Sequence, residues 1–505
     1  MNELLSYLPG QLNEALKSLM YFVPEVHLTI LFILVLLTDL FYGKDSAWIC
    51  RILALAGLIF VASRDIQQLQ FFKTGDNFLL FGQMLALQRT SVLFKIIIDI
   101  ISAILILYFP WDDQLKKHTK GLSDLYSIVI ASVLGLHLMT MAVNLLSIFL
   151  AVEMVSLASY LLAAYRTENA FSAEGGLKYV LFGAVASAVM LYGISLVYVY
   201  TGSLKLYTPE LYNGQLLQGL IHTNPVAVAV AIILVLTGIG FKLSFVPMHF
   251  WVPDVYQGAA TPVTAWLSTL PKIAAFALLL NFIKPFVGMP GWNAFNFQEA
   301  IAVIGIITMI AGNFAAVWQT DIKRILAYSS IGHTGFALMA VAAFSQQGER
   351  ALMFYLVVYA VANIAALVLA TVFSNLTGAK DLKSYQGLGL KYPVISVCFV
   401  IILISLTGLP VSAGFNGKLL AFSAAYSSYQ QNHNQWLLYL LITGALTTVV
   451  SLFYYIKIPL YLFLKKPEKT FEPVRVPLNF TIFIIIVSLA VILLGIFPQI
   501  LSVYL

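Results

Sequence analysis

Charged side chains inside long apolar stretches are the residues of this sequence that could do chemistry. Glu153, Lys242, Lys272 and Lys418 each lie well within a stretch of apolar residues. A charge at the centre of a bilayer costs roughly 2.5–3.5 kcal/mol on insertion scales, so such residues are retained mainly where they pair or conduct. Burial disfavours the charged form of a lysine, whereas a nearby carboxylate favours it. These residues therefore predict proton transfer, although a structural ion pair is the alternative for Glu153.

Lys242 and Lys418 each lie beside a predicted interruption of a helix. The predicted interruptions are at Gly238 and Gly240 in the first segment and at Gly408, Pro410 and Gly414 in the second. Unwound backbone is tolerated at membrane depth only where it is buried or lines a wet cavity, and transporters place ion sites at such breaks. Because break and charge coincide, we expect both lysines to act in ion transfer, together with Lys272.

The remaining charges within apolar segments have simpler interpretations. Lys178 lies one turn after Glu174, so it could belong to the proton path or pair with that glutamate. Lys95 and Asp99 have the i,i+4 spacing of a structural pair on one helical face. Lys457 is close to the end of its segment, where a long side chain reaches the interface, and is expected to anchor the helix.

Three histidines are candidates for a proton path or a gate. His137 and His333 fall within apolar segments, and His249 lies in the loop after the first predicted break. Histidine titrates near neutral pH, but a lone histidine on an apolar face is more often a hydrogen-bonded core residue. For His249 a gate and a packing residue are both open.

Composition indicates a membrane protein around these charges. Of the 505 residues 60% are apolar and 10% are charged, and the mean hydropathy is +0.90. Soluble domains carry roughly 25% charged residues, so soluble and disordered classes are excluded. One crossing needs ~20 apolar residues, which allows about fourteen or fifteen crossings. We expect an all-α membrane protein with about fourteen transmembrane helices.

The sequence offers no recognisable site for a redox cofactor, a metal or a nucleotide. The two cysteines, Cys50 and Cys398, lie in apolar stretches with no Cys/His cluster. Neither the GxGxxG nor the GxxxxGK[ST] pattern occurs. The net charge of +6 comes from basic residues in short loops, which is a topology signal and not a nucleic-acid patch. We expect no cofactor or metal in this chain and no nucleic-acid partner.

The apolar segments alternate across the bilayer. They lie near residues 24–42, 47–63, 86–109, 123–142, 144–165, 171–200, 224–248, 262–284, 298–318, 323–344, 351–375, 392–427, 436–462 and 478–500. With the N-terminus outside, the inner loops hold fifteen Lys and Arg residues and the outer loops hold six. The positive-inside rule then predicts that both termini are outside, in the periplasm of a bacterium.

Spacing indicates an internal repeat. Glu174 and Glu349 are 349 − 174 = 175 residues apart; the first precedes Lys242 by 68 residues and the second precedes Lys418 by 69. Each repeat would contain five crossings, and an odd number makes the second copy inverted, which is a transporter architecture. The predicted units are N-terminal helices in 1–120, a first repeat in 121–290, a second repeat in 291–465 and a final helix in 466–505.

Five stretches carry a resemblance to a known family. They are residues 176–187, 241–258, 261–275, 312–335 and 408–418. These stretches resemble the antiporter-like membrane subunits of respiratory complex I. The Lys-Tyr-x-Leu-x-Gly-Ala-x-Ala-Ser and Leu-Ser-Thr-x-Pro-Lys versions are similar to the subunit N group of NADH:quinone oxidoreductase. The resemblance is strong over about residues 120–460.

The resemblance implies a proton path through Glu153, Lys242, Lys272 and Lys418. It implies that Glu153 modulates Lys242, that Lys272 links two half-channels and that Lys418 serves the exit side. Lys178 matches a further lysine common to this group. The chain would then be a non-redox, proton-translocating subunit, with NADH, FMN, iron–sulfur clusters and quinone on other subunits.

The resemblance also implies partners and a location. The partners are the lipid bilayer and the other complex I membrane subunits in a large hetero-oligomer at the bacterial plasma membrane. Two alternatives stay open from sequence: a subunit of a multi-subunit cation/proton antiporter, and a scaffold subunit whose charges only hold helices together.

Overall fold

The computed structural model is a bundle of long helices and describes residues 2–74, 77–118, 121–206, 219–287, 291–378, 380–466 and 476–504. In these ranges twelve helices are long and apolar enough to cross a membrane. They are α2 (Val23–Tyr42), α4 (Arg89–Tyr108), α6 (Ser123–Met141), α7 (Leu145–Ala163), α8 (Ala170–Thr201), α10 (Pro225–Leu243), α12 (Thr261–Ile283), α13 (Phe297–Val317), α14 (Ile322–Ala342), α15 (Gln346–Thr377), α19 (Gln435–Pro459) and α20 (Leu478–Ile496).

The other elements are shorter or more polar. They are α1 (Asn2–Leu19), α3 (Ala47–Gln68), α5 (Asp113–Lys116), α11 (Val252–Gly258), α16 (Leu388–Lys391), α17 (Pro393–Thr407), α18 (Ala413–Asn432) and α21 (Gln499–Ser502). The strands β1 (Phe78–Leu80) and β2 (Leu85–Leu87) form an antiparallel hairpin in which Phe78 pairs with Leu87. Each apolar segment expected from the sequence contains a helix or a broken pair of helices.

The first break lies later in the chain than Gly238 and Gly240, where the sequence predicts it. α10 continues through Gly238 and Gly240 and ends at Leu243, and the backbone leaves the helix at Ser244, whose φ is 56°. The two glycines permit close packing: a Cβ on Gly238 would lie 2.5 Å from the Met190 sulfur. Small residues at a helix contact allow close approach without breaking the helix. Lys242 still lies beside the true break.

The second predicted break is confirmed. α17 ends at Thr407, Gly408 takes a left-handed conformation with φ of 82°, and α18 begins at Ala413. Gly408 also lies against a side chain, because a Cβ there would come 2.7 Å from Cδ of Lys418. Gly414 lies just inside α18, where a Cβ would collide with the Ser405 carbonyl.

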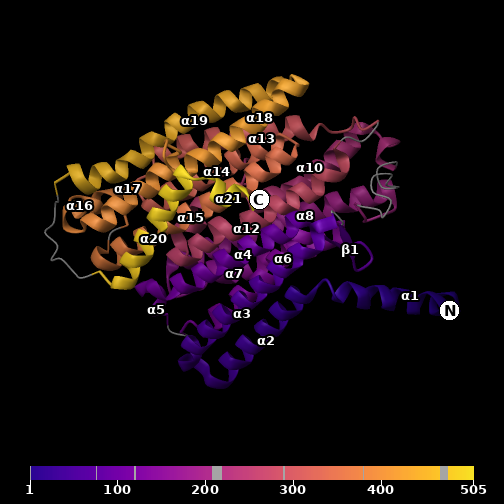
Figure 1. The fold of residues 1–505 in the computed structure, drawn as a ribbon, viewed down its shortest axis with the longest axis horizontal. Helices are drawn as coiled ribbons and strands as arrows, with labels where there is room; N and C mark the ends of the chain where they lie inside the picture. The colour runs from indigo at the N-terminus through magenta and orange to yellow at the C-terminus, as the bar shows by residue number, and fades with distance from the viewer. Residues whose placement is uncertain are drawn as a thin grey trace.

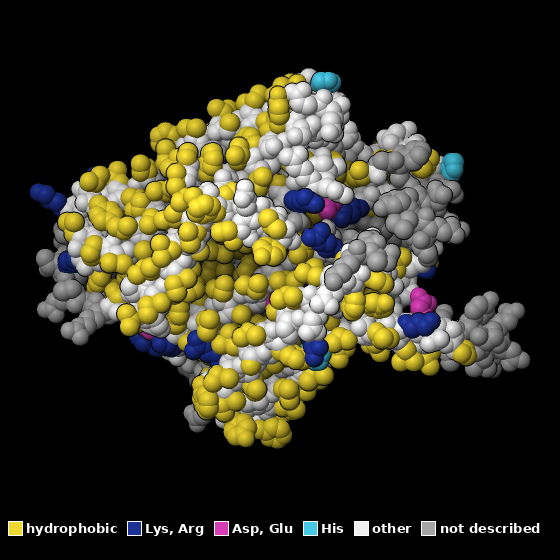
Figure 2. Space-filling model, in the orientation of Figure 1, with side chains coloured by type: hydrophobic (Ala, Val, Ile, Leu, Met, Phe, Trp, Pro, Cys, Tyr) yellow, Lys and Arg dark blue, Asp and Glu magenta, His cyan; other side chains and the backbone are white. Residues whose placement is uncertain are grey.

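The core of the bundle is formed by α12, α14 and α15. The apolar length of α12 is 100% buried inside the protein and that of α14 is 94% buried, against 22% for α20. In Figure 1 the N-terminal helices α2 and α3 lie at one edge, α18 and α19 lie at the opposite edge, and α1 extends away from the bundle. Apolar side chains cover most of the face drawn in Figure 2, as expected for a surface in contact with lipid.

Several sequence-based assignments fall outside the described residues. These are Lys120, Lys469 and Arg475 of the expected inner loops, and the unit limits at residues 120 and 290.

Candidate functional site

Lys272 lies at the centre of the bundle. It is on α12 and is 2% exposed. Its Nζ donates to Ser330 Oγ at 2.7 Å, to the Ser330 carbonyl at 3.0 Å and to Thr334 Oγ1 at 3.0 Å. Both partners are on α14. Among the described residues no carboxylate lies within ion-pair distance of this lysine, so only neutral oxygens hold it.

Hydroxyl groups and an imidazole continue from Ser330. The Tyr359 hydroxyl donates to Ser330 Oγ at 2.8 Å, and the Tyr359 ring lies 4.8 Å from the His333 ring. His333 Nδ1 lies 2.7 Å from the Tyr355 hydroxyl, and its Nε2 lies 3.2 Å from the Tyr455 hydroxyl. These groups can each donate and accept a hydrogen bond, so the network can reverse its polarity when a proton passes.

Lys418 lies on α18, one turn beyond the second break. Its Nζ donates to the Thr407 carbonyl at 2.8 Å and to Thr448 Oγ1 at 3.4 Å, and it lies 4.2 Å from the centre of the Phe336 ring. A cavity with room for about one water molecule borders both Lys418 and His333. The imidazole therefore lies between the Lys272 network and Lys418.

Lys242 and Glu153 face the same interface without forming an ion pair. Lys242 is 2% exposed, and its Nζ, without a hydrogen-bond partner among the described residues, lies 5.7 Å from the Tyr160 and Tyr179 rings. Glu153, on α7, has a buried Oε1 that is also unpartnered. Its charge acts on Lys242, but no contact within 4.0 Å joins them in the described structure. The amine is held chiefly by aromatic ring faces.

A single hydroxyl connects the end of α10 to the central lysine. Thr334 Oγ1 donates to the Leu243 carbonyl at 3.0 Å and accepts from Lys272 Nζ at 3.0 Å. Leu243 is the residue after Lys242, at the last turn of α10. The structure thus brings Lys242, Lys272, His333 and Lys418 into one region of the core.

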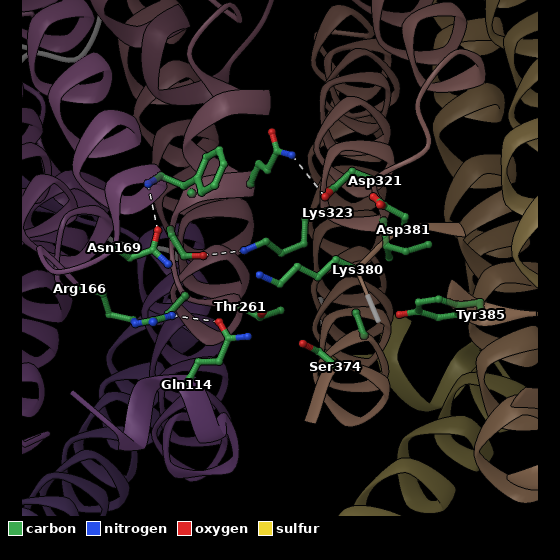
Figure 3. Close-up of a pocket in the computed structure, with 17 residues that line it drawn as sticks. Gln114, Arg166, Asn169, Thr261, Asp321, Lys323, Ser374, Lys380, Asp381 and Tyr385 are labelled. Carbon is green, nitrogen blue, oxygen red and sulfur yellow. Dashed lines mark hydrogen bonds between the residues drawn. The ribbon is translucent and has the colours of Figure 1, made fainter. Parts of the chain in front are cut away.

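A cavity of about 210 Å³, lined by many polar side chains, opens at the end of the bundle where α12 and α14 begin. In Figure 3 Arg166 and Gln114 line one wall, and Lys323 and Lys380 extend toward it from the other. Thr261, the first residue of α12, lies in this cavity. Lys272 is about three helical turns, or roughly 16 Å, further along α12.

Hydroxyl groups lie along α12 between this cavity and Lys272. Thr264 Oγ1 donates to the Tyr256 carbonyl at 2.9 Å, and Ser268 Oγ accepts from Asn363 Nδ2 at 2.6 Å. The Tyr359 hydroxyl also lies 3.3 Å from the Ser268 carbonyl. Thr264 and Ser268 on α12 and Asn363 on α15 are all buried.

Lys178 lies apart from the buried lysines. Its Nζ contacts Glu174 at 2.8 Å and Asp254 at 2.7 Å, and its side chain is 38% exposed. Asp254, on α11, also binds Arg324 of α14 at 2.8 Å. Burial acts to raise the pKa of Asp254, but hydrogen bonds from Lys178 and Arg324 outweigh it and lower that pKa. This network fixes α11, the helix after the first break, to α8 and α14.

His249 lies in the loop between α10 and α11. It is half-buried, and its Nδ1 has no partner among the described residues. Burial lowers the pKa of its imidazole. Its ring stacks beside Phe250 at 4.5 Å. None of the hydrogen bonds described above includes His249, so its role as a gate stays a prediction.

A second group of buried charges lies among the N-terminal helices. Lys95 pairs with Glu25 at 2.8 Å and with Asp65 at 2.7 Å. The pairing of Lys95 with Asp99 expected from sequence is wrong: Asp99 binds His137 Nε2 at 3.0 Å. Tertiary packing brings two carboxylates from other helices closer to Lys95 than its neighbour one turn away. We call Glu25, Asp65, Lys95, Asp99 and His137 the N-terminal cluster.

Lys457 anchors its helix, as expected. Its Nζ donates to the Val317 carbonyl at the end of α13. The contact satisfies a carbonyl that has no partner within its own helix.

Sequence reasoning missed the tyrosines and two acids. Tyr355 and Tyr359 are one turn apart on the buried helix α15, a spacing that would have pointed to a shared polar face. Glu25 and Asp65 lie near segment ends, where charges are ordinary, so nothing local distinguished them.

Three comparisons with known proteins agree on one family. Residues 142–448 match the family model described as NADH:quinone oxidoreductase/Mrp antiporter, TM. NADH-quinone oxidoreductase subunit N 2 of Chloroherpeton thalassium is 37% identical, over 91% of this chain and 89% of that protein. A chain of respiratory complex I from Thermus thermophilus is 30% identical, with a TM-score of 0.75 over 95% of this chain and 98% of that chain. A chain of the Mrp complex from Dietzia sp. has a TM-score of 0.80 at 19% identity, over 97% and 96% of the two chains, a likeness of fold alone.

Proposed function

The chain belongs to the family of NADH:quinone oxidoreductase and Mrp antiporter membrane subunits, and from this premise we propose that it translocates protons as subunit N of a bacterial NADH:quinone oxidoreductase. It is a multi-pass membrane protein and works in a hetero-oligomer with other membrane subunits of the enzyme. The observation that carries the proposal is the series of buried polar groups that runs from Lys272 through Ser330 and Tyr359 to the cavity beside Lys418. In this series the Tyr359 and His333 rings lie 4.8 Å apart.

Protons enter from the polar cavity of Figure 3. This cavity lies at the end of the bundle where Arg166, Lys323 and Lys380 gather, which is the end expected to face the cytoplasm. From there the hydroxyls of Thr264 and Ser268 lead along α12 to Lys272. Lys242, on which the Glu153 charge acts, supplies a second store of charge. Thr334 connects Lys272 to the backbone carbonyl of Leu243, the residue after Lys242.

Lys272 passes its proton toward Lys418. Ser330 accepts from the Lys272 ammonium and from Tyr359, so both donors point at one oxygen. For a proton to pass on from Ser330, the Tyr359 hydroxyl first turns to its other acceptor, the Ser268 carbonyl at 3.3 Å, and Ser330 then donates to Tyr359. His333 then lies between Tyr359 and the cavity that borders Lys418. Lys418, beside the unwound Gly408, serves the exit to the outer side.

No redox step takes place in this chain. NADH, FMN, iron–sulfur clusters and quinone act on other subunits, and their reaction drives the proton transfers described here. We further assign the chain fourteen crossings, with α3 and the broken pair α17 and α18 added to the twelve apolar helices. Helices α6 to α12 and α13 to α19 form the two inverted repeats, and both termini face the periplasm.

Purification of the native assembly through a tag on this chain tests the proposal. We expect the other membrane subunits of NADH:quinone oxidoreductase to copurify. The purified assembly should oxidise NADH with quinone and, in vesicles, acidify one side of the membrane. Copurification with cation-antiporter subunits and sodium/proton exchange without NADH oxidation would instead identify an Mrp-type antiporter. If pumping is normal after substitution of the buried lysines, the chain is a scaffold subunit whose charges only hold helices together.

A further inference from the structure

The N-terminal cluster is a compact set of charges away from the lysine path. Its members come from four helices: Glu25 from α2, Asp65 from α3, Lys95 and Asp99 from α4, and His137 from α6. Each is at most 1% exposed. The path described above uses α7, α10, α12, α14, α15, α18 and α19, so the two sets share no side chain.

The charges of the cluster do not balance without an added proton. Three carboxylates stand against one lysine and one histidine. Both ring nitrogens of His137 face carboxylates, with Nδ1 3.3 Å from Glu25 and Nε2 3.0 Å from Asp99. Two hydrogen bonds to two ionised carboxylates require a proton on each nitrogen, so the ring is an imidazolium. The cluster then carries three negative and two positive charges, and an uncompensated charge is expensive at such depth.

Hydrogen bonding singles out Asp65 among the three acids. Glu25 Oε1 accepts from Lys95 at 2.8 Å and faces His137, and Asp99 Oδ1 faces His137. Asp65 contacts the Lys95 ammonium at 2.7 Å, yet neither of its oxygens has a hydrogen bond of good geometry in the described structure. Hydrogen bonds stabilise the ionised form of a carboxylate, so the acid with the fewest takes a proton first.

A proton on Asp65 leaves the rest of the cluster satisfied. Lys95 keeps Glu25 at 2.8 Å and the Gln68 side-chain oxygen at 2.9 Å. The charged groups that act on Asp65 are Glu25 from α2, Lys95 and Asp99 from α4 and His137 from α6. Arg64, the preceding residue, turns instead to Gln67 at 3.0 Å.

A metal ion is a poorer occupant. Oxygen or nitrogen atoms of Glu25, Asp65 and His137 lie within 4.8 Å of one another, close enough in principle to share an ion. The Lys95 ammonium already lies between Glu25 and Asp65, at 2.8 and 2.7 Å, where a cation would have to sit. A divalent ion there would face an ammonium at contact distance, which Coulomb repulsion opposes.

We propose that the N-terminal cluster is a second proton-binding site, in which Asp65 holds one exchangeable proton separately from the lysine path. The site lies toward the outer ends of its helices: Asp65 is three residues before the end of α3 and His137 four before the end of α6. The proton held there neutralises the cluster and exchanges with the outer side.

Infrared difference spectroscopy of the assembled enzyme tests this inference. Spectra of the wild type and of Asp65→Asn are compared across a pH titration in H₂O and in D₂O. We expect the wild type to contain one carboxylic-acid carbonyl band, shifted in D₂O, that Asp65→Asn removes and Asp65→Glu moves. The matched control is Asp113→Asn, which changes an exposed aspartate paired with Lys116 and should leave the band unchanged.

Assembly supplies a second readout. Asparagine has the shape of a neutral aspartic acid, so the enzyme should assemble normally with Asp65→Asn. Failure of that variant to assemble would overturn the inference, because it would mean that the ionised carboxylate is needed. An unchanged carboxylic-acid band in Asp65→Asn would overturn it as well and leave a purely structural ion network. Neither result depends on pumping through Lys272, so the proposed function is tested separately.

Discussion

Two groups of buried charge in this protein are held in opposite ways. In the N-terminal cluster Lys95 lies against two carboxylates, at 2.8 and 2.7 Å. On the lysine path Lys272 and Lys418 are held by hydroxyl and carbonyl oxygens, and Lys242 lies among aromatic rings. Within the described residues none of these three lysines has a carboxylate at ion-pair distance.

This difference separates an ammonium that keeps its proton, Lys95, from ammoniums that can release theirs. An ammonium paired with carboxylates keeps its proton, and loss of a partner strands a charge in a medium of low dielectric. Neutral oxygens stabilise the charged form of a buried amine less than a carboxylate does. Small changes in nearby charge therefore decide whether such an amine is protonated. The N-terminal cluster should therefore respond to mutation mainly in stability, and the lysine path mainly in pumping.

The largest effect is expected when the cluster loses its lysine. Lys95→Met leaves Glu25 without its ammonium partner, and breaking a buried pair typically costs ~3–5 kcal/mol. We expect little assembled enzyme in membranes, measured by native electrophoresis and by the amount of copurified subunits. The control Lys116→Met removes an exposed pair with Asp113, of the kind worth about 0–1 kcal/mol. Equal assembly of both variants would show that the buried ion pairs of Lys95 matter no more for stability than the exposed pair of Lys116.

The next effect concerns the exit of the lysine path. Lys418→Ala should lower the pumping rate in proteoliposomes at least about tenfold, equal to roughly 1.4 kcal/mol of barrier, because no other amine among the described residues borders the His333 cavity. Lys457→Ala removes an anchor to the Val317 carbonyl and should change pumping little. Similar losses from both substitutions would argue that Lys418 is merely structural.

A smaller effect is expected from the hydroxyl chain. Tyr359→Phe removes the hydrogen bond to Ser330 but keeps the ring beside His333, so pumping should fall by a factor of about ten or less, the cost of roughly one hydrogen bond. Tyr108→Phe is the matched control, since Tyr108 is equally buried and binds the Leu367 carbonyl away from the path. If the two variants pump equally well, the route through Tyr359 is wrong.

Local sequence patterns predict the helices and the buried lysines, but they do not predict the hydrogen-bond and ion-pair partners of those lysines. Runs of apolar residues fix helices whatever their neighbours, and a charge within a run is visible at once, as with Lys272. The partners of that lysine are 58 and 62 residues away on another helix. Local spacing cannot reveal such contacts, and for Lys95 it suggested the wrong acid, because Glu25 is 70 residues away. Glu25 lies at the end of an apolar segment, where a charged residue is usually exposed, so its burial could not be predicted from its position.

The glycines illustrate the same limit in the backbone. Gly408 and Gly238 look alike in sequence, yet one has φ of 82° at a break and the other lies within an intact helix against Met190. Glycine occurs both in turns that need a positive φ and where two helices pack closely. The surrounding structure, and not the glycine itself, determines which of the two applies.

The smallest effect is expected at the exposed network around Asp254. Its pKa is lowered, so its contribution to stability is complete above the ordinary aspartate pKa of about 4 and is lost as pH falls through the lowered value. Asp254→Asn should lose stability above that pH and converge on the wild type in acid, by about 1 kcal/mol or less because the side chain is 37% exposed. Thermal inactivation measured against pH checks this, with Asp113→Asn as control. A constant difference at every pH would contradict the assigned ion pairs.

The number of protons moved per quinone reduced is the most direct test of the lysine path. It would be measured in proteoliposomes with the assembled wild-type enzyme and with Lys272→Met, which keeps the length of the side chain but cannot carry a proton. We expect Lys272→Met to assemble at the wild-type level. It should either move fewer protons per quinone reduced or lose proton pumping and quinone reduction to the same extent. An unchanged proton ratio at an unchanged rate of quinone reduction would show that protons do not pass through Lys272, and the path drawn here would be wrong.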